Sequence, residues 1–173
     1  MLAHDVALLT HAARIAGRIA TSFGGARAKS WDKADGAGPV TEADLAVDTY
    51  LRTTLLAARP DYGWLSEETE DTSHRLSQDT VFIVDPIDGT RSYVEGARTW
   101  AISIAVVHQG TPIAAAIHLP LRDKLYVAGR GLGATLNGAP ITVGRSPTPP
   151  QVLAAKRNFE DRNWPGGRRE AVR

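Results

Sequence analysis

Two aspartates three residues apart, Asp85 and Asp88, stand in the stretch DPIDGT and could hold a divalent cation together. Mg²⁺ prefers oxygen ligands, commonly one or two carboxylates with water and substrate phosphate. Pro86 has a fixed φ, so a stiff turn after the strand can point both carboxylates and the Ile87 carbonyl at one space. Taken alone, the stretch fits a plain surface turn equally well, because Asp, Pro and Gly all favour turns.

The two residues that follow, Gly89 and Thr90, suit an anion. Glycine lets the backbone approach a ligand closely. If Thr90 begins a helix or helical turn, the free amides of both residues face the same space and suit a phosphate. A cation site and an anion site would then lie side by side, as metal-assisted phosphoryl transfer requires.

Two further acidic stretches come earlier in the chain. Asp44 follows Thr41 by three residues, which a capping box at a helix N-terminus explains well, and that role is compatible with a nearby metal. Glu67 and Glu68 follow an apolar run that ends at Leu65. By itself, this pair is typical of a solvated acidic loop.

The elements that must position these acids follow from the hydrophobic period. Apolar residues at spacings of three and four predict one amphipathic helix over 4–22 and a second from Thr41 to about Ala58. The polar, glycine-bearing residues 26–39 between them predict a mobile loop. The expected buried stripe of the second helix is Leu45, Val47, Leu51, Leu55 and Ala58.

After Pro60 the period changes to that of strands. Short β-rich runs are separated by turn residues, and Asn137-Gly138 is the preferred signal for a two-residue hairpin. Two helices followed by a strand meander predict an α+β layered domain, with both helices packed on one face of an antiparallel sheet. We expect this domain to cover residues 1–145. The proline-rich stretch 144–151 marks a boundary, so residues 146–173 are expected to be a linker and the start of a second α/β domain.

Composition excludes several classes of protein. The 173-residue chain has a formal net charge of +1, too weak a field to indicate nucleic-acid binding. It has no cysteine, which excludes disulfides and thiolate metal sites. The N-terminus lacks the pattern of a signal peptide, and no run approaches the roughly 18 apolar residues of a membrane helix. We therefore expect no membrane span and a cytoplasmic location.

Taken in order, the motifs VTEAD, SEE and DPIDGT resemble the inositol monophosphatase family of Mg²⁺-dependent, lithium-sensitive sugar and nucleotide phosphatases. The stretch GLGATLNGAPI is similar to a hairpin of that family, and the resemblance covers roughly residues 4–160. It implies the layered α/β sandwich of the sugar phosphatases and a small phosphorylated substrate. It also implies two or three Mg²⁺ ions and suggests a homodimer.

The resemblance also implies a set of metal ligands. Glu67, Asp85 and Asp88 match carboxylates of the metal pair, and Ile87 matches a residue that gives its carbonyl. Asp44 matches the acid beside a third, more weakly bound metal.

Other residues match the reacting groups. Glu67 and Thr90 would orient the attacking water, and the amides of Gly89 and Thr90 would hold the phosphate. The implied reaction is in-line attack of metal-activated water on a phosphate monoester, without a covalent enzyme intermediate. The absence of cysteine and of a Ser/His nucleophile elbow agrees with it.

Two residues bear on the substrate. Ser66 precedes the glutamate pair and Arg91 follows the glycine-threonine pair, and both are similar to the residues that 3′(2′),5′-bisphosphate nucleotidases carry there. We therefore expect this nucleotidase activity. Inositol-1-monophosphatase and histidinol-phosphatase are the alternatives, since histidinol-phosphatases of the family also carry a basic residue at the position of Arg91. Arg91 can equally be an exposed turn residue.

The chain departs from the family after the hairpin. Family members continue into a second α/β half with a W-D-x-A-A-G motif, whose aspartate completes the metal site. Here the late tryptophan, Trp164, is followed by Pro165, so we expect the second half to be truncated. A non-catalytic domain that binds metal or phosphate is therefore the rival interpretation.

Overall fold

The computed structural model describes residues 2–34, 36 and 38–144. Two long helices, α1 (Leu2–Ser22) and α2 (Glu42–Ala58), confirm the predicted pair. A third, short helix, α3 (Thr90–Val94), begins at Thr90. The predicted linker and second domain at 146–173, together with Trp164, lie outside the described residues.

Seven strands form one sheet in the order β3-β4-β5-β6-β7-β8-β9. Their bounds are β3 (Gly63–Ser66), β4 (Thr80–Asp88), β5 (Ala101–His108), β6 (Thr111–Leu119), β7 (Lys124–Gly129), β8 (Gly133–Leu136) and β9 (Ala139–Ile141). The prediction of an antiparallel sheet is wrong at one edge, because β3 pairs parallel with β4. Parallel pairing needs a connection that returns the chain to the starting end of the sheet. Residues 67–79, which include the 3₁₀ helix η2 (Ser73–Ser77), provide it.

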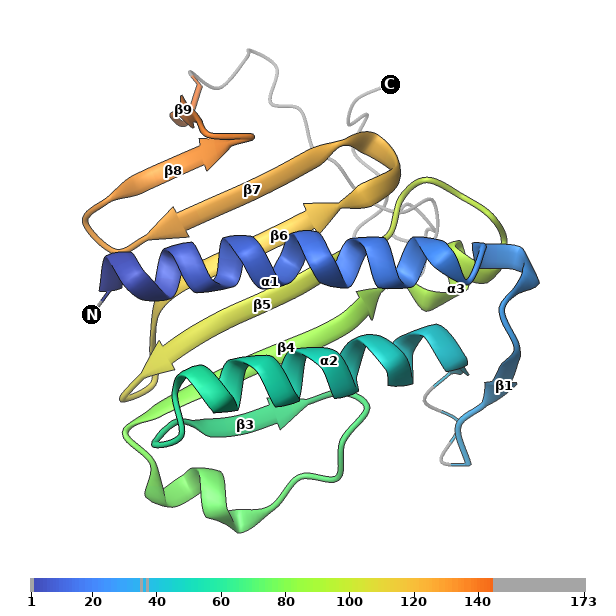
Figure 1. The fold of residues 1–173 in the computed structure, drawn as a ribbon, viewed down its shortest axis with the longest axis horizontal. Helices are drawn as coiled ribbons and strands as arrows, with labels where there is room; N and C mark the ends of the chain where they lie inside the picture. Colours follow the sequence, from blue (N-terminus) through green and yellow to red (C-terminus); the bar gives the residue numbers. More distant parts are fainter. Residues whose placement is uncertain (1, 35, 37, 145–173) are drawn as a thin grey trace, which may run out of the picture. The chain divides into compact units, whose positions relative to one another are not determined.

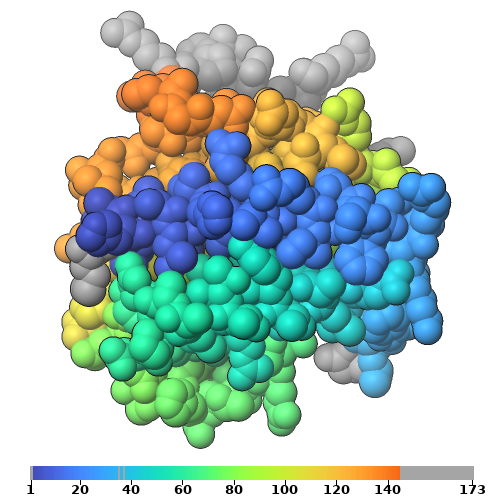
Figure 2. All heavy atoms as spheres, viewed as in Figure 1, coloured from blue at the N-terminus to red at the C-terminus, as the bar shows by residue number. Residues whose placement is uncertain are grey.

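Both long helices cover the same face of this sheet, as Figure 1 shows and as the order of the predicted elements indicates. α1 packs on β5, β6 and β7, whereas α2 packs on β4 and against α1. Figure 2 shows the two helices crossing this face side by side. Small residues let α1 lie close to the strands: Ala12, Ala13, Ala16, Gly17 and Ala20 are all buried.

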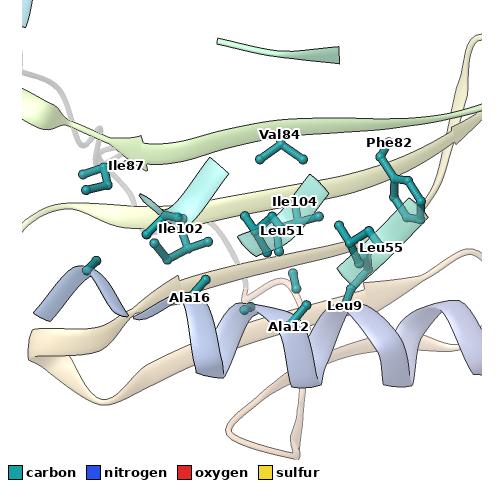
Figure 3. Packing of buried hydrophobic residues seen from close by; sticks show 14 of the residues in the cluster. Leu9, Ala12, Ala16, Leu51, Leu55, Phe82, Val84, Ile87, Ile102 and Ile104 are labelled. Atoms are coloured by element: carbon teal, nitrogen blue, oxygen red, sulfur yellow. The ribbon is translucent and has the colours of Figure 1, made fainter. Parts of the chain in front are cut away.

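The core lies between these helices and the sheet (Figure 3). Leu51 and Leu55 of α2 meet the inward residues of the strands, which include Phe82, Val84, Ile102 and Ile104. Leu45 and Ala58 do not belong to the buried stripe, contrary to the prediction: both are exposed, Leu45 by 42%. On the sheet face away from the helices, Ile83 and Ile117 are also exposed.

The described residues between α1 and α2 form more regular structure than the mobile loop predicted over 26–39. The 3₁₀ helix η1 (Gly25–Arg27) follows α1, and β1 (Ser30–Asp32) pairs with β2 (Pro39–Thr41) in a small antiparallel sheet. Strands of three residues are too short to carry a periodic signal, which is why the sequence missed them.

The predicted hairpin at the end of the described chain is confirmed. Asn137 and Gly138 join β8 to β9, with φ of 51° and 85°, the left-handed values that this type of turn requires. Among the described residues, no helix is both long enough and apolar enough to span a membrane.

Candidate functional site

A bulge in β4 brings the two aspartates of DPIDGT to the same side of the strand. Asp85 pairs with Ser103 and Asp88 with Ala101, so three steps on β4 oppose two on β5. In a regular strand, residues three apart would point to opposite faces. The extra residue of the bulge returns Asp88 to the side on which Asp85 lies. Ile87 turns inward and is only 1% exposed, whereas Asp88 is exposed. The turn predicted after the strand is therefore a bulge within it.

Gly89 and Thr90 form the transition from β4 to α3. Gly89 has φ 89° and ψ 41°, a left-handed conformation that favours glycine. Thr90 Oγ1 lies 3.0 Å from the Ile87 carbonyl oxygen and 3.2 Å from Asp44 Oδ1, and it can donate a hydrogen bond to either. Arg91 is exposed on the first turn of α3.

Asp44 reaches this transition from the start of α2. It is fully buried and completes the predicted capping box, in which its carboxylate accepts from the Thr41 amide at 2.9 Å. Burial raises the pKa of Asp44 above its ordinary value, although hydrogen bonds from Thr41 and Thr90 oppose that rise. Asp44 thus joins the N-terminus of α2 to the N-terminus of α3.

Glu67 and Glu68 lie where β3 ends, and Lys33 of the β1–β2 hairpin binds both. Its ammonium nitrogen is 2.9 Å from Glu67 Oε1 and 2.7 Å from Glu68 Oε1. The Glu68 side chain is only 5% exposed, and burial raises its pKa while Lys33 lowers it. Burial also works against the charge of Lys33, but its hydrogen bonds to Glu68 and Glu67 outweigh burial and raise the pKa of Lys33.

Asp48 of α2 holds the segment on both sides of this glutamate pair. Its Oδ1 accepts a short hydrogen bond from Ser66 Oγ, and its Oδ2 accepts one from Thr69 Oγ1 at 2.5 Å. Both Ser66 and Asp48 are buried. The Ser66 hydroxyl is therefore occupied by Asp48, and this bond positions the segment that carries Glu67 and Glu68.

The carboxylates together make this end of the sheet strongly acidic. The pKa of Asp85 is raised to about 7, first by burial and then by the negative charges of Glu67, Asp88, Asp44 and Glu68. Like charges brought together in this way disfavour ionisation unless a cation compensates them. Lys33 compensates Glu67 and Glu68, whereas Asp85 has no ion pair among the described residues.

The donor types, carboxylate oxygens and the Ile87 carbonyl, are ones that a hard cation prefers. Within the described part of the chain, however, no three Asp, Glu or His side chains converge closely enough to form a complete metal-binding group. Two of the acids have their oxygens occupied, Asp44 by Thr41 and Thr90, and Glu67 in part by Lys33. Side-chain rearrangement is thus needed before these residues can surround an ion.

Sequence reasoning missed three residues around the acids: Lys33, Asp48 and Thr69. Lys33 lies in the segment predicted to be a mobile loop, so nothing local indicated its partner. Asp48 did carry a signal, because it follows Asp44 by four residues and must lie on the same side of the helix.

Comparison with known proteins bears on this arrangement. The family model described as "Inositol monophosphatase family" matches residues 1–164. The chain is 41% identical over 110 residues to an inositol-1-monophosphatase of Rhizobium meliloti, covering 61% of this chain and 39% of that protein. It is 35% identical over 140 residues to a histidinol-phosphatase of Chlorobaculum parvum, covering 80% of this chain and 53% of that protein.

Solved structures give the same picture of the fold. The extragenic suppressor protein suhB from Bartonella henselae superposes with a TM-score of 0.73 at 34% identity, covering 80% of this chain and 54% of that one. An IMPase/NADP phosphatase complexed with Mg²⁺ and phosphate has a TM-score of 0.64 at 27% identity, covering 69% and 45%. The chain spans about 40% to 55% of the length of these four proteins.

Proposed function

The chain belongs to the inositol monophosphatase family, and from this premise we propose that it hydrolyses a small phosphate monoester in a Mg²⁺-dependent reaction. The observation that carries the proposal is the group of carboxylates around Asp85: burial first, and then their negative charges, raise the pKa of Asp85 to about 7, beside the left-handed Gly89. A partly buried acidic cluster beside the start of a helix suits a cation and a phosphate together. The relatives named as phosphatases support the same reaction.

We propose that Glu67, Asp85, Asp88 and the Ile87 carbonyl hold the metal, with Asp44 beside a more weakly bound ion. Bound Mg²⁺ would lower the pKa of a water molecule and neutralise charge on the phosphoryl oxygens. Support comes from the bulge, which turns Asp85 and Asp88 to one side of β4. Further support comes from Lys33, whose ammonium already provides positive charge at Glu67.

The remaining groups would act on water and phosphate. Glu67 and Thr90 would orient the attacking water as hydrogen-bond partners, with the Thr90 hydroxyl within reach of the Ile87 carbonyl and of Asp44. The amides of Gly89 and Thr90 would donate hydrogen bonds to the phosphate, and Arg91 would contribute charge toward a substrate anion.

For the substrate, the proposed 3′(2′),5′-bisphosphate nucleotidase activity rests on Ser66 and Arg91. Ser66 is buried against Asp48, so it offers no side-chain contact to a substrate, and Arg91 alone supports a second anionic group. Inositol 1-phosphate and histidinol phosphate are supported at least as well, because relatives are named for these two activities.

A second candidate function is binding of metal and phosphate without turnover. It remains open because no three acidic or histidine side chains of the described residues converge on one point, which argues against a preformed catalytic metal centre. Inhibition by Li⁺, a homodimer and a cytoplasmic location remain predictions of the sequence.

The experiment is phosphate release by the purified 173-residue chain with Mg²⁺ on histidinol phosphate, inositol 1-phosphate and adenosine 3′,5′-bisphosphate. Turnover on one of them, abolished in Asp88→Asn and retained in the surface control Asp79→Asn, would support the phosphatase. A folded chain that binds Mg²⁺ but releases no phosphate would reject the catalytic proposal and favour the second candidate.

A further inference from the structure

Trp31, on β1, is the one exposed tryptophan of the described part of the chain. It is 42% exposed, whereas Trp64 and Trp100 are only 9% and 3% exposed. Trp31 lies outside the hydrophobic core and joins neither of the two ring pairs found among the described residues. A single exposed apolar residue is ordinary on a protein surface, so the position of Trp31 decides what its ring can do.

Trp31 lies on the side of the β1–β2 hairpin that faces the domain. It pairs with Val40, and directly opposed residues of an antiparallel pair share one face. Val40 is only 4% exposed, so this face is the inner one. The Lys33 amide donates to the Gly38 carbonyl at 2.9 Å, which continues the pairing as far as Lys33. Residues two apart on a strand point to the same side, so Trp31 and Lys33 leave the hairpin on one face.

This inner face meets the acidic site. The ammonium nitrogen of Lys33 lies 2.9 Å from Glu67 Oε1 and 2.7 Å from Glu68 Oε1. Two residues of a strand span about 6.6 Å, so the side chain of Trp31 starts about that far from the side chain of Lys33. Figure 1 shows β1 at the end of the sheet where β4 runs into α3. Trp31 thus borders the acidic site and offers an aromatic surface beside its charged groups.

We infer that Trp31 is a specificity-determining residue, whose ring stacks on a flat heteroaromatic leaving group of the phosphate monoester. The inference rests on the proposed phosphatase function and adds the chemical class of the leaving group. Charged groups of the site suit the metal and the phosphate, whereas an uncharged ring system is bound by apolar contact. Indole has a large aromatic face, and stacking of a base on an aromatic side chain is favourable in water.

The three proposed substrates differ in this respect. Adenosine 3′,5′-bisphosphate carries a purine and histidinol phosphate an imidazole, whereas inositol 1-phosphate has no aromatic ring. Stacking on Trp31 therefore favours the first two substrates over the third. The shared chemistry is a flat nitrogen heterocycle, and separate measurements on the two substrates distinguish a purine from an imidazole.

The test measures initial rates of Mg²⁺-dependent phosphate release by the full chain on adenosine 3′,5′-bisphosphate, histidinol phosphate and glycerol 2-phosphate, which has no ring. Trp31→Leu should raise the KM of a ring-bearing substrate about tenfold or more, a loss typical of one stacking contact. It should leave the KM and kcat of glycerol 2-phosphate unchanged. Trp31→Phe keeps a ring and should recover most of the loss. The control is Leu132→Ala, a change of a residue that is 58% exposed between β7 and β8, and it should alter no KM.

The pattern across substrates decides the inference. A KM effect confined to adenosine 3′,5′-bisphosphate identifies a purine, and one confined to histidinol phosphate identifies an imidazole. An equal rise for all three substrates would overturn the inference, because Trp31 would then act on the hairpin and not on a ring. An unchanged KM in Trp31→Leu, or no recovery in Trp31→Phe, would overturn it as well.

Failure of the proposed phosphatase function gives a different result. No phosphate release from any of the three compounds would reject that function, and the compounds would then serve as stable ligands in a titration with Mg²⁺. In the ¹⁵N-labelled chain, the indole N–H signal of Trp31 is the one that disappears in Trp31→Phe. A saturable shift of this signal with a ring-bearing ligand, and none with glycerol 2-phosphate, would support stacking without catalysis. No saturable shift with either ring-bearing ligand would overturn the inference.

Discussion

The Asp48 carboxylate, one helical turn after Asp44, accepts a hydrogen bond from the Ser66 hydroxyl at the end of β3. Thr69 donates to its other oxygen, so one buried side chain fixes the backbone on both sides of Glu67 and Glu68. A buried carboxylate without a cation is costly unless hydrogen bonds satisfy it. These two bonds therefore matter for stability and for where the glutamates point.

Replacing Asp48 by alanine should loosen the glutamate pair. We expect the free energy of unfolding to fall by about 2 kcal/mol or more, because two hydroxyls lose a charged acceptor. Mg²⁺ affinity should fall as well, since Glu67 loses its support. Urea denaturation and calorimetric Mg²⁺ titration would measure the two effects.

The control for Asp48→Ala is Thr49→Ala, whose exposed hydroxyl bonds only the Leu45 carbonyl of its own helix. It should change stability little and Mg²⁺ affinity not at all. If Asp48→Ala bound Mg²⁺ as tightly as the unchanged chain, the positioning role of Asp48 would be wrong.

Lys33 is the counter-cation of Glu67 and Glu68, so Mg²⁺ at the proposed metal site would have to compete with it. Lys33→Met should make the metal-free chain less stable, because the glutamates lose their compensating charge. The same change should tighten Mg²⁺ binding about fivefold, since displacing a partly exposed ion pair costs about 1 kcal/mol. Calorimetry at fixed ionic strength would measure the affinity.

Lys29→Met is the matched control, because Lys29 is an exposed lysine near the start of the same hairpin. Its Mg²⁺ affinity should equal that of the unchanged chain. Weaker Mg²⁺ binding in Lys33→Met would mean that Lys33 assists the metal instead of competing with it.

Asp85 should make the stability of the metal-free chain depend on pH. Its pKa is about 7 in the folded chain against an ordinary 3.8, so the folded state holds this proton more tightly than the unfolded state. The free energy of unfolding should therefore decrease as pH rises from about 4 to about 7. Asp85→Asn should remove that decrease and be more stable than the unchanged chain above pH 7.

Thermal unfolding followed by circular dichroism in EDTA, from pH 4.5 to pH 8, would measure this. Asp61→Asn, a change of an exposed aspartate, should keep the pH dependence of the unchanged chain. An identical pH dependence in Asp85→Asn would mean that other groups determine it.

The sequence predicted the elements whose signal is local. The two helices follow from apolar spacing, and the start of α2 follows from the capping box between Thr41 and Asp44. The acids of β4 could be found by type and spacing, as could the hairpin at Asn137 and Gly138. These features depend on residues only a few positions apart.

The missed features depend on distant pairing. The bulge that turns Asp85 and Asp88 to one side is set by the register of β4 with β5, which the sequence of β4 alone does not contain. β3 has four residues, too few for a period to separate a parallel edge strand from a loop. The contacts of Lys33 and Asp48 likewise join segments that are 18 to 35 positions apart.

Gly17 permits the close approach of α1 to the end of β6, and its replacement by alanine should destabilise the fold. An added Cβ would lie 2.5 Å from His118 Nδ1 and 2.8 Å from Pro120 Cγ. His118 Nδ1–H donates to the Ala13 carbonyl at 2.9 Å, so the ring cannot move without losing that bond. Alanine gains about 1 kcal/mol of helix propensity, but overpacking costs about 1–3 kcal/mol.

A double-mutant cycle separates these two contributions. Gly17→Ala alone should lower the free energy of unfolding by about 1 kcal/mol, as measured by urea denaturation. In the His118→Ala background much of the clash is absent, so the same change should cost little or become stabilising through helix propensity. An equal loss of stability in both backgrounds would mean that contact with the His118 ring is not what requires glycine at position 17.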